Sequence, residues 1–272
     1  MIVDLHCHST HSDGVLTPQQ LVTLAEKNNI EILAITDHDN IDAYQDLAKI
    51  KTKVKLVTGV EFSTTWSRIG IHIVALNFDI NAQNMQQAVA FQAKARISRA
   101  KIISQKLEKY GVFNAYEKVL TANENKQIGR PDFARLLVKE GVAKDFAQAF
   151  KKFLGAGKRG DVKNQWLSME EIINVTKLAG GVAVLAHPLY YKLTNNKLNR
   201  LVQHFKDSGG IGIEVINGKQ NPEKIEYLLK LCKQFNLQAS IGSDFHQSTS
   251  WNHLGYNSKL IGNVATVWDD FI

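Results

Sequence analysis

Residues 1–39 read MIVDLHCHSTHSDGVLTPQQLVTLAEKNNIEILAITDHD, and this stretch carries two kinds of structural signal in turn. The apolar run Ile2–His6 predicts a short strand. Thr17–Asn28 predicts a helix, because it opens with a threonine that can cap the first turn and a proline that suits the first helical position. The run Ile30–Thr36 is rich in β-branched residues and predicts a second strand. The N-terminal stretch therefore predicts a strand–helix–strand unit.

The same alternation continues along most of the chain. Further apolar strands are predicted, with helical stretches between most of them, at Lys55–Val60, Gly70–Asn77, Gly181–Ala186, Ile211–Ile216 and Gln238–Ser243. Strands that alternate with helices form a mainly parallel sheet, either open or closed into a barrel. In both arrangements the chemistry gathers at the carboxyl ends of the strands.

The middle of the chain interrupts this pattern. Residues 81–165 are basic, helical in character and poor in strand signals. We therefore expect an inserted helical domain that binds substrate, between two barrel segments at residues 1–80 and 166–272. Within the insertion, Gln83–Tyr110 predicts one long helix that is closed by Gly111.

The composition is that of a globular protein, since 44% of the 272 residues are hydrophobic and only 22% are charged. No apolar run approaches the ~20 residues of a membrane helix, and the N-terminus lacks the features of a signal peptide. We therefore expect a cytoplasmic protein without membrane association. Cys7 and Cys232 are too few for a disulfide framework and are expected to be free, buried thiols. The net charge of +7 favours anionic partners, although a solvated basic surface explains it equally well.

Polar residues recur at or just beyond the predicted strand ends. Each of them alone is more often structural than functional, but scattered surface histidines would not favour these positions. The joint pattern predicts a metal site, formed by His6, His8, His38, Glu61, His72, His187, Asp244 and His246.

The spacing of the first candidates explains how they could share metal ions. His6 and His8 are two residues apart, so on an extended strand their imidazoles project to the same side. Asp13 follows in a Ser-Asp-Gly turn, where an Asx turn is an equally good explanation. His38 lies between two aspartates, either of which could orient its ring.

The later candidates suit a cluster of several ions. Glu61 ends an otherwise apolar strand, and a carboxylate can bridge two metal ions. His72 lies inside an apolar run, where either a metal or a hydrogen bond would satisfy its imidazole. His187 precedes Pro188, which stops the strand. Histidine and carboxylate ligands without cysteine suit Mn, Zn or Fe(II) and exclude a thiolate zinc finger.

Taken together, these motifs resemble those of the PHP superfamily, named for polymerase and histidinol phosphatase. The four motifs occur here as His6-Cys7-His8 with Ser12-Asp13-Gly14, Thr36-Asp37-His38-Asp39, His187-Pro188, and Gly242-Ser243-Asp244-Phe245-His246. The resemblance implies an α/β fold, a distorted (β/α)7 barrel with an inserted helical subdomain. It also implies three divalent metal ions at the carboxyl ends of the strands, with manganese expected and zinc or iron as alternatives.

The same resemblance assigns the ligands to the three ions. The first ion would be held by His6, His8, Glu61 and Asp244, the second by Asp13, His38 and His246, and the third by Glu61, His72 and His187. No ligand position is missing, which argues against a merely structural version of the domain. The residues expected to act in catalysis are Asp13, Arg130 and His246.

Within the superfamily, the chain resembles the YciV- and TrpH-like bacterial subgroup. The resemblance rests on the helical insertion, on the stretches Ile128–Arg135 and Phe153–Gly155, and on the strand Gly180–Ala186. It implies an enzyme that removes the 3′-phosphate from nucleoside 3′,5′-bisphosphates and trims RNA from its 5′ end. The loop GAGKRGDV, residues 155–162, departs from the usual form of the subgroup, which carries a proline and an aromatic residue.

Three basic residues of the insertion are expected to bind substrate phosphate. Arg130 is a candidate clamp for two phosphate oxygens, and a surface arginine at a helix start is the equal alternative. Lys158 and Arg159 lie within Gly155–Gly160, which is predicted to be a flexible basic loop. A solvated loop without a ligand is the other explanation for this pair.

Two other functions stay open at this point. One is a phosphomonoesterase that acts on AMP or on histidinol phosphate, although the basic insertion disfavours a small cationic substrate. The other is a non-catalytic nucleic-acid-binding PHP module, which the chain length and the complete ligand set disfavour. The expected substrate is therefore a nucleotide or short single-stranded RNA, and no obligate protein partner is evident.

Overall fold

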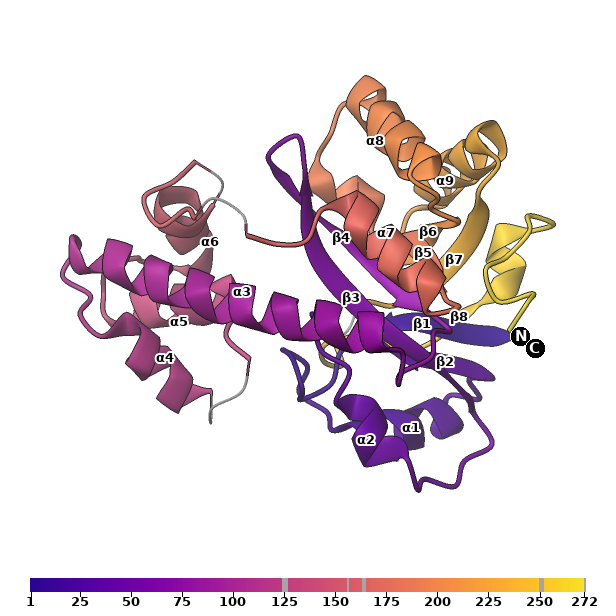
Figure 1. Cartoon of the computed structure of the whole chain (residues 1–272), viewed down its shortest axis with the longest axis horizontal. Coiled ribbons are helices and arrows are strands. Elements are labelled where there is room, and N and C mark those ends of the chain that lie inside the picture. The colour runs from indigo at the N-terminus through magenta and orange to yellow at the C-terminus, as the bar shows by residue number, and fades with distance from the viewer. Residues whose placement is uncertain (124–126, 156, 163–164, 250–251, 272) are drawn as a thin grey trace. The chain divides into compact units, whose positions relative to one another are not determined.

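A computed structural model describes residues 1–123, 127–155, 157–162, 165–249 and 252–271 (Figure 1). Over these residues the strands form an eight-stranded sheet in the order β7-β6-β5-β4-β3-β2-β1-β8. The strands are β1 (Ile2–Cys7), β2 (Ile32–Ile35), β3 (Lys55–Trp66), β4 (Ile69–Leu76), β5 (Val182–Leu185), β6 (Gly212–Asn217), β7 (Gln238–Gly242) and β8 (Tyr256–Asn257).

Helices connect most of the strands. The α-helices are α1 (Pro18–Lys27), α2 (Ala43–Leu47), α3 (Gln83–Glu108), α4 (Ala115–Ala122), α5 (Arg130–Lys139), α6 (Phe146–Ala149), α7 (Met169–Leu178), α8 (Asn195–Asp207) and α9 (Pro222–Phe235). The shorter turns are a π-helix, η1 (Phe150–Leu154), and two 3-10 helices, η2 (Pro188–Tyr191) and η3 (Ser258–Ile261). No helix within the described residues has both the length and the apolar composition that a membrane crossing requires.

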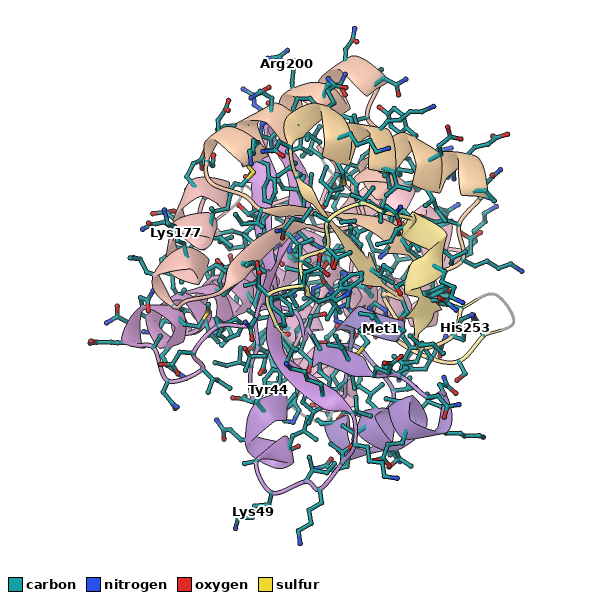
Figure 2. All side chains as sticks on the ribbon, turned by 90° about the vertical axis from the view of Figure 1, so that its right-hand side faces the viewer. Met1, Tyr44, Lys49, Lys177, Arg200 and His253 are labelled. Carbon is teal, nitrogen blue, oxygen red and sulfur yellow. The ribbon has the colours of Figure 1, made fainter. Side chains whose placement is uncertain are left out.

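The first three strands pair in parallel, as the alternating pattern predicts. Helix α1 begins where the sequence places it: the Thr17 side chain accepts a hydrogen bond from the Gln20 amide, and the Gln20 side chain accepts one from the Thr17 amide. Helix α2 is short, and its Tyr44 hydroxyl lies within hydrogen-bonding distance of carbonyl oxygens on both β2 and β3. Tyr44 therefore fixes α2 against the sheet (Figure 2).

The hairpin of β3 and β4 breaks the strand–helix alternation. The two strands pair antiparallel, and β3 runs on to Trp66 because β4 supplies backbone partners beyond the predicted end at Val60. Ser67 and Arg68 both have positive φ, 47° and 68°, as a tight hairpin turn requires. β4 then pairs antiparallel with β5. These antiparallel pairs are the distortion of the barrel.

The C-terminal half returns to parallel pairing and closes the sheet. β5, β6 and β7 are parallel, with α8 and α9 between them. The segment after β7 then meets β1: the Asp244 amide donates to the His6 carbonyl at 2.7 Å, and the His8 amide donates to the Phe245 carbonyl at 2.9 Å. The predicted distorted barrel of seven strands is confirmed, and β8 adds antiparallel to β1.

Charged side chains point outward from the barrel unit and its two thiols are buried, as the composition indicates. Charged residues of the connecting helices, among them Lys177 on α7 and Arg200 on α8, point outward (Figure 2). Cys7 and Cys232 are both buried and free, which confirms the prediction for the two thiols.

The chain divides into two compact units. The barrel unit consists of Met1–Ala90 and Leu167–Ile272, and the helical unit consists of Phe91–Trp166. Long helix α3 spans the boundary between them: Met85 belongs to the core of the barrel unit, whereas Leu107 belongs to the core of the helical unit. The insertion expected at residues 81–165 thus begins inside a helix instead of before it, because the first turns of α3 carry apolar residues of the barrel core.

The helical unit has its own apolar core, built on residues of α3, α4, α5 and η1. The basic loop that was expected to be flexible includes residue 156, which lies outside the described residues. The rest of this loop is held by hydrogen bonds: the Gly160 amide donates to the Phe153 carbonyl at 2.7 Å, and the Gly157 amide donates to Asp161 Oδ2 at 2.6 Å. The described part of the loop therefore has a defined backbone.

Candidate metal centre

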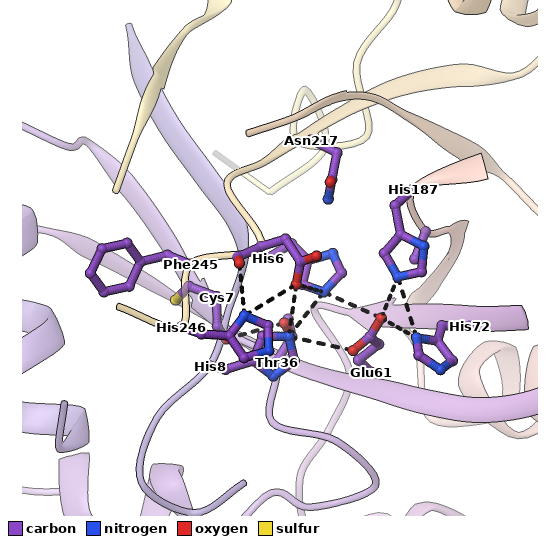
Figure 3. A network of polar contacts seen from close by, with 12 residues as sticks. His6, Cys7, His8, Thr36, Glu61, His72, His187, Asn217, Phe245 and His246 are labelled. Carbon is purple, nitrogen blue, oxygen red and sulfur yellow. Dashed lines mark hydrogen bonds and ion pairs between the residues drawn. The ribbon is translucent and has the colours of Figure 1, made fainter. Parts of the chain in front are cut away.

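All of the predicted metal ligands converge in the barrel unit. Figure 3 shows His6, His8, Glu61, His72, His187 and His246 among them. They come from β1 and the turn after it (His6, His8, Asp13), the end of β2 (His38), the β3–β4 hairpin (Glu61, His72), the end of β5 (His187) and the end of β7 (Asp244, His246). The two hairpin residues lie within strands instead of at strand ends, which differs from the sequence expectation. Their place still matches the others because the regular parallel pairing of β3 with β2 ends at Thr58, and Glu61 then makes an isolated parallel bridge with His38.

Glu61 is the centre of the cluster and is fully buried. Its Oε1 lies 2.7 Å from His72 Nδ1, 2.9 Å from His187 Nε2 and 3.4 Å from His6 Nε2. Its Oε2 faces two further imidazoles, with ring nitrogens at 2.7 and 3.4 Å. Five histidine rings therefore direct a nitrogen at one carboxylate.

This donor set fits divalent metal ions better than hydrogen bonds alone. A carboxylate offers about four lone-pair sites, fewer than the imidazoles around Glu61. Ring nitrogens also face one another, at 3.2 Å between His6 Nε2 and His8 Nε2 and at 3.3 Å between His72 Nδ1 and His187 Nε2. Converging nitrogen and oxygen donors of this kind are satisfied together when a cation lies between them. The residues present therefore fit a cluster of divalent metals.

The pKa shifts of Glu61, His8 and His72 favour metal binding, whereas nearby carboxylates, Glu214 for His6 and Glu61 for His187, raise the pKa of these two histidines against the effect of burial. Burial alone would raise the pKa of Glu61, but the His72 and His38 imidazoles hold it well below its usual range. Burial and the neighbouring His246 lower the pKa of His8, and burial lowers the pKa of His72 despite its contact with Glu61. An ionised carboxylate and neutral imidazoles are the forms that bind metals.

Asp13 and His246 form an accessible side of the cluster. His246 Nε2 lies 3.2 Å from Asp13 Oδ1, and the His8 and His246 rings stack with centroids 4.2 Å apart. Although burial opposes the shift, Asp13 raises the pKa of His246 to about 9. Against the effect of burial, His38 and His246 hold the pKa of Asp13 well below its usual range. Positive charge is therefore favoured between these side chains.

Three groups of ligand candidates have donor atoms within 4.8 Å of one another. They are His8, Asp13, His38 and His246; His6, His8 and Glu61; and His38, Glu61 and His72. Asp244 adds to the group of His6, since its Oδ1 lies 3.2 Å from His8 Nε2 and 3.5 Å from His6 Nε2. His8 and His38 each belong to two of these groups. The groups therefore share more residues than the three ligand sets that the resemblance implies.

Glu214 orients two of the ligands, and the sequence analysis did not single it out. Its Oε1 accepts a hydrogen bond from His6 Nδ1 at 2.9 Å, and its Oε2 accepts one from the His187 amide at 2.6 Å. Because the carboxylate can only accept, the bond places the His6 proton on Nδ1 and leaves the Nε2 lone pair facing the cluster. Glu214 could have been found by the argument used for Glu61, since it too is a carboxylate within an apolar strand.

Comparison with known proteins identifies the family of the chain. The PHP domain family matches residues 4–218, a span that contains the ligands from His6 to His187. The chain belongs to the PHP family. Relatives of this PHP protein include a 5′-3′ exoribonuclease of Haemophilus influenzae, which is 43% identical over 273 residues with 98% of each chain covered.

A curated relative and a solved structure from Chromobacterium violaceum are also similar to the chain. A 3′,5′-nucleoside bisphosphate phosphatase is 34% identical over 270 residues, which cover 98% of this PHP protein and 95% of the relative. The solved structure of an amidohydrolase with bound sulfate has a TM-score of 0.86 at 31% identity, and the match covers 98% of this chain and 95% of that one. The predicted family and the predicted enzyme class, a hydrolase acting on phosphate esters, are confirmed.

Asp37 fixes the turn that carries Asp13 in the PHP barrel. Its carboxylate accepts hydrogen bonds from the Ser9 hydroxyl and the Ser12 hydroxyl, both at 2.6 Å, and from the Ser9 amide at 2.7 Å. Gly14 closes the same turn, where an added Cβ would lie 2.1 Å from a backbone carbonyl oxygen. The sequence predicts that Asp37 or Asp39 could orient the His38 ring. In the structure, the Asp37 carboxylate instead fixes the turn.

The predicted clamp Arg130 lies in the helical unit of the PHP protein. It begins α5, is partly buried, and its Nη1 donates to the Leu154 carbonyl at 3.4 Å. It borders a small hollow together with Arg96 and Arg99. The guanidinium carbons of Arg96 and Arg99 lie 5.3 and 5.4 Å from the centroid of the Trp166 ring. The hollow is therefore bordered by three arginine residues.

Lys158 and Arg159 are both exposed on the loop after η1. The guanidinium carbon of Arg159 lies 4.9 Å from the centroid of the Tyr110 ring and 5.3 Å from that of Phe153. Aromatic contact of this kind holds the arginine side chain in place and leaves its charge available.

Proposed function

We propose that the chain is a metal-dependent phosphoesterase that removes the 3′-phosphate from nucleoside 3′,5′-bisphosphates and trims short RNA from its 5′ end. The observation that carries the proposal is the complete set of nitrogen and oxygen donors around the buried Glu61. The substrate class is supported by the activities of the two enzyme relatives, an exoribonuclease and a bisphosphate phosphatase. The proposed setting is the cytoplasm, where buried free thiols are stable.

The proposed cofactors are three divalent ions, with manganese first and zinc or iron as alternatives. Imidazole and carboxylate donors without thiolate suit these metals. The proposed ligand sets are His6, His8, Glu61 and Asp244; Asp13, His38 and His246; and Glu61, His72 and His187. When bound, such ions neutralise phosphate oxygens and lower the pKa of a coordinated water, which supplies the nucleophile.

The protein's own residues hold this centre in one geometry. Glu214 keeps His6 and the backbone of His187 in place, and Asp37 keeps the turn of Asp13 in place. Asp13 and His246 are proposed to act in catalysis because they lie on an accessible side of the cluster: 31% and 34% of their side-chain surface is exposed, against 1% for Glu61. We propose that the substrate phosphate approaches from this side.

The second phosphate of a bisphosphate is proposed to bind in the helical unit. Arg130 is the proposed clamp, since it shares a hollow with two other arginines, and Lys158 and Arg159 are proposed to assist. Guanidinium groups bind tetrahedral oxyanions through paired hydrogen bonds. The solved relative also holds a sulfate, an oxyanion of the same shape as phosphate, which supports oxyanion binding by a protein of this fold.

The test is a comparison of kcat/KM on adenosine 3′,5′-bisphosphate, AMP, histidinol phosphate and a 5′-phosphorylated oligoribonucleotide, all in the presence of manganese. The bisphosphate should be preferred over AMP, because binding energy from the phosphate that does not react can be used to position the one that does. The oligoribonucleotide should be shortened from its 5′ end. Equal kcat/KM for the bisphosphate and AMP would indicate that the protein is a plain phosphomonoesterase instead. The control is Glu61→Gln, which should be inactive on all four substrates.

A further inference from the structure

Tyr190 is a large aromatic side chain left exposed beside the metal centre. It lies in η2, the 3-10 turn that directly follows the ligand His187, and 59% of its surface is exposed. Its ring stacks on the His187 ring, with centroids 5.5 Å apart and planes inclined by 20°. The exposed ring therefore lies directly beside a predicted metal ligand.

The backbone of the turn that carries Tyr190 is held in place both before and after this residue. Pro188 occupies its start and fixes one backbone angle, and the Tyr190 amide donates to the His187 carbonyl at 2.9 Å. The next residue, Tyr191, is anchored in the sheet: its hydroxyl donates to the Ala186 carbonyl at 2.7 Å and accepts from the His72 amide at 2.9 Å. Tyr190 therefore presents its ring from a fixed backbone, with one face on a ligand and the other toward solvent.

A fixed, exposed ring beside a phosphate-binding centre suits the flat face of a nucleobase. Stacking of a base on an aromatic side chain needs no hydrogen bonds to the base edge, so every base can use the same platform. A platform on a rigid turn also loses little conformational freedom when the base binds. An enzyme that shortens RNA must accept each base in turn. A platform that contacts only the face of the base, and makes no hydrogen bonds to its edge, meets this need.

We propose that Tyr190 is the stacking platform for the base of the nucleotide whose phosphate reacts at the metal centre. This inference rests on the proposed function, since it requires a nucleotide substrate. The competing explanation is that Tyr190 only covers the His187 ring and keeps it in place. The two explanations differ in one respect: a cover affects every substrate equally, whereas a platform affects only substrates that carry a base.

The first experiment compares Tyr190→Ala and Tyr190→Phe on adenosine 3′,5′-bisphosphate and on ribose 3,5-bisphosphate, which lacks the base. In Tyr190→Ala, the KM for the nucleotide should rise ~10-fold with kcat little changed, because base stacking contributes to binding. The KM for the ribose substrate should stay within ~2-fold, as expected for a group that contacts only the base. Tyr190→Phe should resemble the wild type on both, because it keeps the ring. An equal loss on both substrates in Tyr190→Ala, or no loss on either, would overturn the platform.

Two further variants guard against a folding artefact. Tyr190→Leu keeps apolar bulk over His187 but has no aromatic face, so it should behave as Tyr190→Ala on the nucleotide. Leu260→Ala is the control, since Leu260 is 53% exposed in η3, whose first residue pairs with the backbone of Met1 at the other end of β1. It should leave both KM values unchanged. If Tyr190→Leu restores the nucleotide KM, the ring acts as a cover and the platform is wrong.

A binding measurement separates this inference from the proposed function. In Tyr190→Trp, the tryptophan fluorescence should be quenched by AMP and not by ribose 5-phosphate, with wild-type protein as the reference for the other tryptophans. If the wild type hydrolyses no nucleotide but AMP still quenches the fluorescence of the introduced indole, the proposed function fails, and only base stacking at residue 190, without a reacting phosphate, stands. If nucleotides are hydrolysed but AMP leaves the fluorescence of Tyr190→Trp unchanged, the platform fails and the proposed function stands.

Discussion

The barrel unit and the helical unit hold their charged side chains in different ways. In the barrel unit, Glu61 and Glu214 are buried and each contacts several polar partners from other strands. In the helical unit, Lys158 is exposed and Arg159 lies over aromatic rings. Buried groups with several partners keep one geometry, whereas exposed groups adjust to a ligand at small cost. Under the proposed function, the barrel unit sets the chemistry and the helical unit tunes the choice of substrate.

Removal of the metal ions tests the role of the barrel unit most strongly. Chelation and dialysis should lower kcat by ~10³-fold or more, because the cluster offers no alternative to a metal-bound nucleophile. Addition of manganese should restore turnover. The measurement is phosphate release with the metal content determined on the same sample. Full activity in a verified metal-free preparation would show that the cluster is structural.

Loss of an accessible ligand should be the next largest effect. Asp13→Ala or His246→Ala should lower kcat ~100-fold or more, which corresponds to about 3 kcal/mol of transition-state stabilisation. His253→Ala is the matched control, since this histidine is exposed, stacks on Tyr256 and is not among the predicted ligands. Thermal melts should show that the fold survives in all three variants. Near-wild-type kcat with undiminished metal content would show that neither residue is a metal ligand.

Substitution of the orienting carboxylate should have a smaller effect. Glu214→Gln keeps the shape of the side chain but allows the His6 ring to lose its fixed proton position. We expect metal affinity or kcat to fall ~10- to 100-fold, the range for residues that hydrogen-bond a metal ligand. A manganese titration of activity measures the shift. If the titration curve is unchanged, Glu214 serves packing alone and the buried network of the barrel is more tolerant than we infer.

The helical unit should give the smallest and most selective effect. Arg130→Ala should lower kcat/KM ~10-fold for the bisphosphate and less for AMP, as expected for the loss of one charge-assisted contact to a remote phosphate. The difference between the substrates should shrink as salt is raised. Arg135→Ala, on the same helix and paired with Asp132, is the control. An equal loss for both substrates would assign Arg130 to the stability of the helical unit.

The barrel and its ligands could be predicted because their signals are local. A strand followed by a capped helix fixed the start of α1 at Thr17, and histidines two residues apart placed His6 and His8 on one side of β1. The ends of parallel strands meet at one edge of a sheet, so polar residues at these ends had to converge. Cross-strand distances were not needed for that conclusion.

The features that sequence could not give depend on pairing between distant residues. The extension of β3 past Val60 follows from its pairing with β4, and the role of Glu214 follows from contacts with His6 and His187, which lie far from it in the chain. The boundary that the structure sets within α3, between Ala90 and Phe91, could not be predicted for the same reason. Whether a turn of α3 belongs to one apolar core or another depends on what packs against it, which the helix pattern does not contain.

The hydrogen bonds between β1 and the segment after β7 bring residues from the two ends of the chain together. Ions bound by His6 and His8 on one side and by Asp244 and His246 on the other would link these segments and enclose nearly the whole chain in one loop. Closing a long loop removes more entropy from the unfolded chain than closing a short one. In a protein whose two thiols are buried and free, bound metal therefore acts as a reversible cross-link, which a chelator opens and a reducing agent does not.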